Sequence, residues 1–568
     1  MDLTHEQTRA LIEKVTRELA AQGLLPPPGS ASAAAPTAPG RGTTAPVAPA
    51  GDAPTCGLAP PDSETSRHVG RAYGSRSSAG GPPDEARRPG PASAGSAAHV
   101  AGAAVREAAA RQAAEQPNRP QNLGPRKTRG VFPDLEPAVR AAEAAHRQLV
   151  ALPLWVRAAC LENVRRKLRD NVRLLAELAV SETGMGRVAD KVKKNLLVIN
   201  QTPGIEDLEP HVYSGDHGLT LTEWAPYGVI GAAGPSTNPS ETIINNGLGM
   251  IAGGNAVVFA PHPSAKGVCQ TTISLFNEAV AEAGGPENVI TTVAEPTIAS
   301  AQAMMRHPKT RLLVVTGGPA VVKEAMASGK KVIAGGPGNP PVVVDETADL
   351  VAAGRDIVAG ASLDNNIICT DEKEVFVVER AAAALKAAML RHGAWEASPL
   401  QIEQLRKLTL ERDNGPRRHS TVNRDLVGRD AAVILKQIGV AVGPEVRIIL
   451  CEVPPDHPFV WTEMLMPVLP LVRAAHAEEA MEWAQAAEHG FRHTASIYSK
   501  NIERLSAMAR LMDCSIFVKN APNYAGLGMG GEGPTSFTIA SPTGEGMTTA
   551  RTFTRKRRCV LVDYFRIV

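Results

Sequence analysis

Cysteines at metal-binding or redox spacing are missing from this sequence of 568 residues. Seven cysteines stand singly, at positions 56, 160, 269, 369, 451, 514 and 559, with no CxxC and no His/Cys pair at zinc spacing. An odd and scattered set argues against a disulfide framework and against a zinc site. We therefore expect no metal, and a reducing compartment in which a functional thiol stays free.

A long apolar run and an excess of one charge are also missing. No stretch reaches transmembrane length, and the N-terminus has no signal-peptide core. Lysine and arginine total 60 against 58 acidic residues, a net charge of +2, so the charge balance predicts no binding to nucleic acid or membranes. We expect a soluble, cytoplasmic protein.

Large apolar residues are scarce between residues 23 and 125, where Ala, Pro, Gly, Ser and Thr dominate. Such a segment buries too little apolar surface to offset its chain entropy, so we predict a disordered linker. Residues 1–22 before it contain an amphipathic helix with one apolar stripe, formed by Leu11, Ile12, Val15 and Leu19. A helix on a long tether is typical of a peptide that docks in a partner's groove. The alternatives are a helix that folds back onto the body and a membrane-surface helix, which the mixed charges of its polar face disfavour.

The dinucleotide fingerprint GxGxxG is absent, although strand–turn–helix units begin at Gly228, Asn255 and Arg311. Alternating strands and helices predict an α/β fold with a parallel sheet that binds its ligand at the carboxyl ends of the strands. The glycine-rich turns offer backbone N–H groups to a dinucleotide, although a tight turn alone also explains each glycine. Upstream, residues 130–200 have helical periodicity, and we interpret their lysine run at 191, 193 and 194 as a solvated helix face.

One cysteine, Cys369, lies between an Asn365–Asn366 pair and an expected strand from Glu374 to Glu379. A thiol at a loop-to-strand junction can face a cleft and act as a nucleophile in its thiolate form. The alternative is a small buried core residue, which is the commoner role of a lone cysteine.

Five motifs now occur in order: PSTNP, VTGG, AGGPGNPP, DNNIIC and EMLMPV. This order resembles the aldehyde dehydrogenase superfamily, and more narrowly the CoA-acylating propionaldehyde and acetaldehyde dehydrogenases of bacterial microcompartments. The resemblance covers Gly130 to Val568. It implies an NAD-binding domain of Rossmann type at 126–340 with a hairpin at 205–224, a catalytic domain at 341–545, an oligomerisation strand at 546–568 and a homo-oligomer. By the same resemblance, residues 1–22 target the enzyme to shell proteins and thus to a microcompartment lumen.

The resemblance also assigns site residues. Cys369 matches the nucleophile that forms a thioester, and Asn238 matches the oxyanion asparagine, although alone it reads equally as a turn residue before Pro239. Glu463 matches the glutamate on the nicotinamide ribose, although it could also be a surface carboxylate. The remaining cofactor positions are Thr316, Gly317, Gly318, Pro235, Ser236 and His262, and His262 replaces a lysine of hydrolytic relatives, which favours NAD over NADP. His493 either assists deprotonation of coenzyme A or is structural.

A carboxylate is missing where hydrolytic relatives carry their deacylating glutamate, because residues 332–338 read VIAGGPG. Without that base, water should attack the thioester slowly, whereas coenzyme A brings its own nucleophile. We therefore predict oxidation of an aldehyde to its acyl-CoA, and the resemblance implies an aldehyde of two to four carbons. The alternatives are a hydrolytic enzyme that releases a free acid and, in another class, an inactive body that serves shell assembly. The basic run Arg551 to Arg558 precedes an expected strand from Cys559 to Phe565. We therefore interpret the run as a strand flank or subunit contact rather than a nucleic-acid site.

Overall fold

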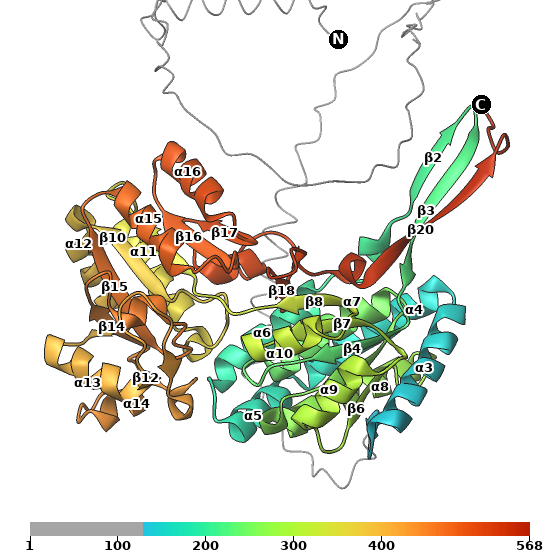
Figure 1. Ribbon diagram of the computed structural model, residues 1–568, viewed down its shortest axis with the longest axis horizontal. Coiled ribbons are helices and arrows are strands. Elements are labelled where there is room, and N and C mark those ends of the chain that lie inside the picture. Colours follow the sequence, from blue (N-terminus) through green and yellow to red (C-terminus); the bar gives the residue numbers. More distant parts are fainter. Residues whose placement is uncertain (1–128) are drawn as a thin grey trace, which may run out of the picture. The chain divides into compact units, whose positions relative to one another are not determined.

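The computed structural model describes residues 129–568. The predicted helix at 1–22 and the predicted linker at 23–125 lie outside the described residues. Two parallel sheets with helices on both faces, and one three-stranded antiparallel sheet, are the main sheets of the described chain (Figure 1). No helix between residues 129 and 568 is long and apolar enough to cross a bilayer.

The first sheet has six parallel strands in the order β1-β6-β5-β4-β7-β8. Its strands are β1 (Val131–Phe132), β4 (Val229–Ala233), β5 (Ala256–Ala260), β6 (Ile290–Val293), β7 (Thr310–Thr316) and β8 (Lys331–Gly335). The central strands are mainly apolar, as expected of a sheet covered on both faces. One face packs on α3 (Leu135–Ala151), α9 (Ile298–Arg306) and α10 (Pro319–Met326). The other packs on α4 (Leu154–Asp170), α5 (Val172–Thr183), α6 (Val188–Gln201), α7 (Pro239–Ala252) and α8 (Lys266–Glu282).

The second sheet has seven parallel strands in the order β11-β14-β15-β10-β9-β16-β17. They are β9 (Pro341–Val344), β10 (Glu374–Val378), β11 (Ala394–Glu396), β14 (Ile448–Glu452), β15 (Val468–Ala474), β16 (Thr494–Tyr498) and β17 (Ile516–Lys519). Helices α11 (Leu350–Ala361) and α12 (Glu379–Arg391) cover one face. Helices α13 (Pro399–Thr409), α14 (Ala431–Gln437), α15 (Ala477–Ala487) and α16 (Ile502–Met512) cover the other.

The third sheet is antiparallel and has the order β2-β3-β20, from β2 (His211–Gly215), β3 (Gly218–Pro226) and β20 (Thr554–Val562). Our expected C-terminal strand, Cys559 to Phe565, is wrong in its bounds. The strand runs from Thr554 to Val562, because β3 offers it a nine-residue partner in that register. The basic run therefore lies largely within the strand instead of flanking it.

Two pairs of short antiparallel strands complete the sheets: β12 (Leu410–Arg412) with β13 (Thr421–Val422), and β18 (Ile539–Ala540) with β19 (Gly546–Met547). Short 3-10 turns lie between the longer elements, at Ile205–Leu208, Pro263–Ala265, Leu363–Asn366, Arg424–Leu426, Pro458–Trp461, Asn523–Leu527 and Ala550–Phe553.

Candidate active site

Cys369 lies in the turn between the Leu363–Asn366 segment and β10, and it is half-buried. Asp364, Asn365 and Asn366 before it have φ angles of 49°, 60° and 66°. Asp and Asn adopt this left-handed region more readily than other non-glycine residues, which suits three of them to a tight turn. Side-chain and backbone hydrogen bonds fix the backbone on both sides of Cys369. The position of its thiol is therefore set by this turn.

Gly338, in the loop after β8, lies where two other segments meet this cysteine. A Cβ at Gly338 would stand 2.6 Å from the Cys369 carbonyl oxygen and 3.1 Å from Cγ of His493, so no larger residue fits without a shift. The Gly338 N–H also points to Oε1 of Glu463, at 3.4 Å. The structure therefore places Cys369, Glu463 and His493 around one glycine.

The pKa values of these three groups reflect that enclosure. Burial raises the pKa of Cys369 to about 12, with the Glu463 carboxylate adding to the effect and the Lys373 ammonium opposing it. Burial raises the pKa of Glu463 to about 7, and burial followed by Lys373 lowers the pKa of His493 to about 4. At neutral pH, Cys369 is thus a resting thiol and His493 is a neutral imidazole.

Asn238 ends the loop between β4 and α7, where it is the N-cap residue and is buried. Its Oδ1 accepts a hydrogen bond of 2.6 Å from Lys194 Nζ, and its Nδ2 donates to Thr237 Oγ1 at 3.2 Å. The same ammonium lies 2.5 Å from Oδ2 of Asp364, in the turn that leads to Cys369. Lys194 therefore ties the predicted oxyanion residue to the nucleophile's turn.

Our interpretation of the lysine run as a solvated face is wrong for two of its members. Lys193 is 60% exposed, but Lys191 and Lys194 are fully buried beside Asp364. Burial would lower the pKa of Lys194, but the Asp364 and Glu241 carboxylates outweigh it and raise that pKa, so the pair stays ionised. Helical spacing could have indicated this burial, because residues 191, 194 and 198 share one helix face and Val198 is buried.

The predicted cofactor positions lie along one edge of the first sheet. Pro235 and Ser236 follow β4, His262 follows β5, and Thr316 ends β7, and these three strands are neighbours. Gly317 and Gly318 lead into α10, and no atom lies within 4 Å of where a Cβ on Gly318 would stand. The carboxyl edge of a parallel sheet with open glycine turns suits a dinucleotide. His262 is exposed, and its Nδ1 hydrogen-bonds with the Ser264 hydroxyl, so its ring is oriented locally.

The strand β8 and its following loop carry no carboxylate toward Cys369, as the sequence indicated. Val332 to Gly335 are buried, and a Cβ at Gly336 would stand 2.6 Å from Pro542 Cγ. Glu463 is the carboxylate that Gly338 positions beside the cysteine. Among residues 129–568, no cluster of three or more His, Cys, Asp or Glu side chains is arranged to hold a metal ion.

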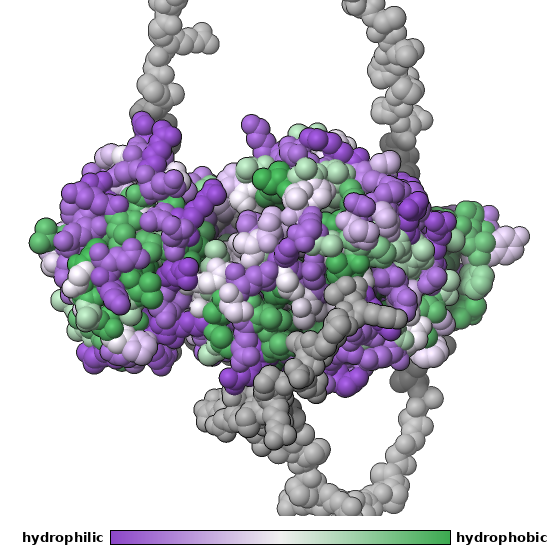
Figure 2. Space-filling view, turned by 90° about the horizontal axis from the view of Figure 1, so that it is seen from below, coloured by the Kyte–Doolittle hydropathy of each residue, from purple (hydrophilic) through white to green (hydrophobic). Residues whose placement is uncertain are grey.

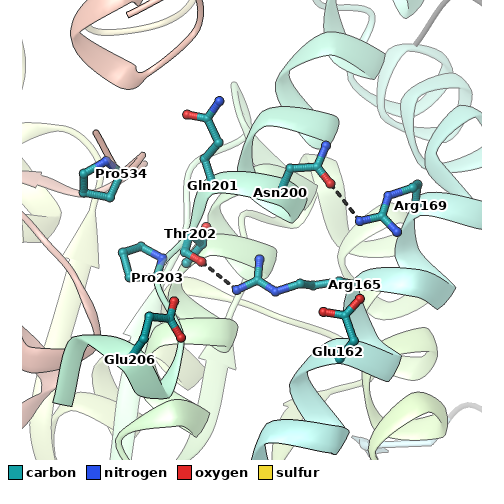
Figure 3. Close-up of a pocket in the computed structure, with 9 residues that line it drawn as sticks. All are labelled: Glu162, Arg165, Arg169, Asn200, Gln201, Thr202, Pro203, Glu206 and Pro534. Carbon is teal, nitrogen blue, oxygen red and sulfur yellow. Dashed lines mark hydrogen bonds between the residues drawn. The ribbon is translucent and has the colours of Figure 1, made fainter. Parts of the chain in front are cut away.

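A separate cavity of about 540 Å³ lies between α4, the end of α6 and the loop at Pro534, away from every predicted site residue (Figure 3). Its two arginines already have acceptors. Arg165 donates to the carbonyls of Ile199 and Thr202, and Arg169 donates to Asn200 Oδ1 at 2.8 Å. Both arginines are thus engaged within the protein, and none of the predicted site residues lines this cavity.

The aldehyde dehydrogenase family model matches residues 128–541. The chain belongs to the aldehyde dehydrogenase family. This membership confirms the predicted resemblance and gives the two parallel sheets their family fold.

Individual similar proteins give a narrower comparison than the family model. The chain is 53% identical over 440 residues to acetaldehyde dehydrogenase (acetylating) EutE of Salmonella typhimurium, covering 77% of this chain and 94% of that protein. It is similar to the Rhodopseudomonas palustris propionaldehyde dehydrogenase solved with bound CoA and an acylated cysteine, with a TM-score of 0.74, 47% identity and coverage of 76% of this chain and 98% of that one. It also resembles the propionaldehyde dehydrogenase of the Clostridium phytofermentans fucose utilisation bacterial microcompartment, with a TM-score of 0.75, 45% identity and coverage of 78% and 100%.

Proposed function

We propose that this enzyme oxidises a short-chain aldehyde to its acyl-CoA, with NAD as hydride acceptor and coenzyme A as acyl acceptor. The observation that carries the proposal is the enclosure of Cys369 by Gly338, Glu463 and His493 next to a β8 loop without a carboxylate. Its acylating relatives of 53% and 47% identity support the same reaction class.

In this mechanism the Cys369 thiol first gives its proton to solvent. The thiolate then attacks the aldehyde carbon, and the carbonyl oxygen becomes an alkoxide. The Asn238 Nδ2 and the Cys369 backbone N–H donate to that oxygen; loss of one such donor typically costs about 10²–10³ in rate. NAD, when bound, supplies the hydride acceptor. Cys369 is then left as a thioester.

The deacylation step distinguishes acyl-CoA from free acid. Water needs a base to attack a thioester at a useful rate, and residues 332–338 supply none. A thiol co-substrate is a stronger nucleophile and needs only to lose its proton. The neutral His493 imidazole beside Cys369 is an acceptor for that proton.

The residues proposed to bind NAD come from both parallel sheets. Thr316, Gly317, Gly318, Pro235, Ser236 and His262 would hold NAD at the carboxyl edge of the first sheet, and Glu463 would hold its nicotinamide ribose from the second sheet. The Thr316 hydroxyl is held at 2.7 Å by that of Thr538, which orients it at the strand end.

The antiparallel sheet supports a homo-oligomer. Its exposed apolar residues belong to the two outer strands, β2 and β20, and to the chain end after them: Val212, Tyr213, Leu561, Val562 and Phe565. In Figure 2, apolar residues also gather at the end of the described body where Figure 1 draws these strands. An exposed apolar sheet is typical of a subunit contact. Analytical ultracentrifugation of Val562→Glu should show a smaller species than the unmodified protein.

A relative from a bacterial microcompartment supports enclosure in such a compartment, with residues 1–22 as the shell-targeting segment. Fusion of residues 1–22 to a fluorescent protein, co-expressed with shell proteins, should concentrate fluorescence in the shells. Diffuse fluorescence would contradict the targeting role and leave the enzymology intact.

The reaction itself is tested by product analysis. Propionaldehyde or acetaldehyde with NAD should yield NADH and acyl-CoA when CoA is present, and only about one NADH per active site when it is absent. Continued NADH formation and free acid without CoA would establish the hydrolytic alternative instead.

A further inference from the structure

Two buried lysines share a feature that the reaction scheme above does not use. Each ammonium caps the oxygen of an amide, and in each case the N–H end of that amide is a donor of the proposed oxyanion site. The first is Lys194, fully buried, which donates to Asn238 Oδ1 at 2.6 Å.

The second is Lys373, also buried, under the turn that carries Cys369. Its Nζ donates to the Ile368 carbonyl at 3.0 Å, and to the carbonyl and Oδ1 of Asn366 at 2.7 and 2.8 Å. The Ile368 carbonyl and the Cys369 N–H belong to one peptide group, and in a trans peptide they point in opposite directions. Binding the oxygen therefore aims the Cys369 N–H away from Lys373. Within residues 129–568 this N–H donates to no backbone carbonyl, and its acceptor is the Cys369 side chain itself.

We propose that Lys194 and Lys373 are positioning residues that orient and polarise the two amides of the oxyanion site. An ammonium has donors only, so it can face only the oxygen end of an amide. Asn238 is thereby held with Nδ2 toward the substrate, and the peptide before Cys369 is held with its N–H outward. A hydrogen bond accepted by an amide oxygen from a charged donor also strengthens the N–H donor of that amide.

The proposal rests on the proposed function, since it needs Asn238 and Cys369 to meet the alkoxide. It competes with a purely structural role, because Lys194 also lies 2.5 Å from Asp364 Oδ2 and 3.3 Å from Glu241 Oε1. Lys191 provides a matched control. It is equally buried and binds the same Asp364 oxygen at 2.9 Å, but its other partner is the Thr237 carbonyl and not Asn238.

A double-mutant cycle separates the two roles. The kcat/KM for propionaldehyde would be measured with saturating NAD and CoA in the full-length enzyme carrying Lys194→Met, Asn238→Ala or both. Asn238→Ala should lose about 10²–10³-fold, and Lys194→Met about tenfold or more. In the Asn238→Ala background, Lys194→Met should cost less than about twofold more, because residues that act as one unit are not additive. Lys191→Met should cost the same factor in both backgrounds.

The outcomes distinguish the failure of each idea. If Asn238→Ala keeps near-normal kcat/KM, the proposed oxyanion role of Asn238 fails. If Asn238→Ala is impaired but Lys194→Met costs the same factor in both backgrounds, the proposed function stands and the positioning role of Lys194 is overturned. Lys194→Met leaves the buried Glu241 carboxylate without its ion-pair partner. The cycle is therefore repeated with Lys194→Met/Glu241→Gln, which preserves the Lys191–Asp364 pair.

Lys373 is tested by the way its loss divides between kcat and KM. The alkoxide exists only after attack, so Lys373→Met should lower kcat about tenfold or more and change KM for the aldehyde less than about twofold. Rates are divided by the folded fraction, obtained from thermal unfolding of the same sample. A lower melting temperature with kcat per folded enzyme unchanged would overturn the role of Lys373.

Discussion

The candidate sites at the two parallel sheets differ in how closely their residues are packed. At the carboxyl edge of the first sheet, the predicted cofactor residues are half-exposed or exposed, and the space beside Gly318 is open. At the second sheet, the turn of Cys369 is crowded, with Gly338 under its carbonyl and Lys373 and Asp364 fully enclosed. A cofactor that enters and leaves needs room, whereas a covalent intermediate needs fixed geometry. Four changes test this contrast.

The largest effect is expected at the nucleophile. Cys369→Ala should reduce aldehyde oxidation on the order of 10⁴-fold or more, because no other group can hold the acyl chain. Steady-state NADH formation measures this. The exposed Cys559 is the control, and Cys559→Ser should leave the rate unchanged. Substantial turnover by Cys369→Ala would show that Cys369 is not the nucleophile.

Two glycines measure the difference in crowding directly. Gly338→Ala puts a methyl group 2.6 Å from the Cys369 carbonyl, so the turn must shift, and a misplacement of about 1 Å can cost about 10²-fold in kcat. Gly318→Ala meets open space at a backbone φ of −68° that alanine accepts. It should mainly raise KM for NAD, by less than about tenfold. Equal kcat losses in the two variants would refute the contrast.

The pH dependence of stability tests the enclosure of Glu463. Its pKa is raised to about 7 from the usual 4.5 by burial, so the folded state holds a proton that the unfolded state has already lost. The stabilising effect is present below about pH 4.5 and is lost as pH rises through 7. Glu463→Gln should therefore be more stable than the unmodified enzyme at pH 8 by about 1–3 kcal/mol and nearly equal near pH 4.5. Urea unfolding at both pH values checks this, and a difference that grows toward low pH would contradict it.

The smallest effect is expected on the exposed side of α6. Lys193→Ala should change the free energy of unfolding by less than about 0.5 kcal/mol, as is usual for an exposed charge. Lys191→Met, two residues away, breaks a buried ion pair and should cost about 3–5 kcal/mol. Chemical denaturation of both variants measures the difference. Similar values would mean that the buried charges are not paired as the structure has them.

The sequence alone was enough for the family and the α/β class, because these depend on motifs whose order and composition are read along the chain. The roles of the named site residues stay predictions. The missing carboxylate at 332–338 was equally plain from sequence. It also predicted a strand at the C-terminus, but β-pairing with β3 decided where that strand begins and ends.

Only the tertiary structure decided which of the three lysines Lys191, Lys193 and Lys194 are buried. Helical periodicity places Lys191 and Lys194 on one face and Lys193 on another, but it does not say what that face meets. The partners that make burial of two ammonium groups possible are Asp364, about 170 positions further on, together with Glu241 and Asn238 from α7 and its N-cap. A buried charge is stable only where opposite charges and hydrogen-bond acceptors converge on it, and that convergence exists only once distant segments have packed together.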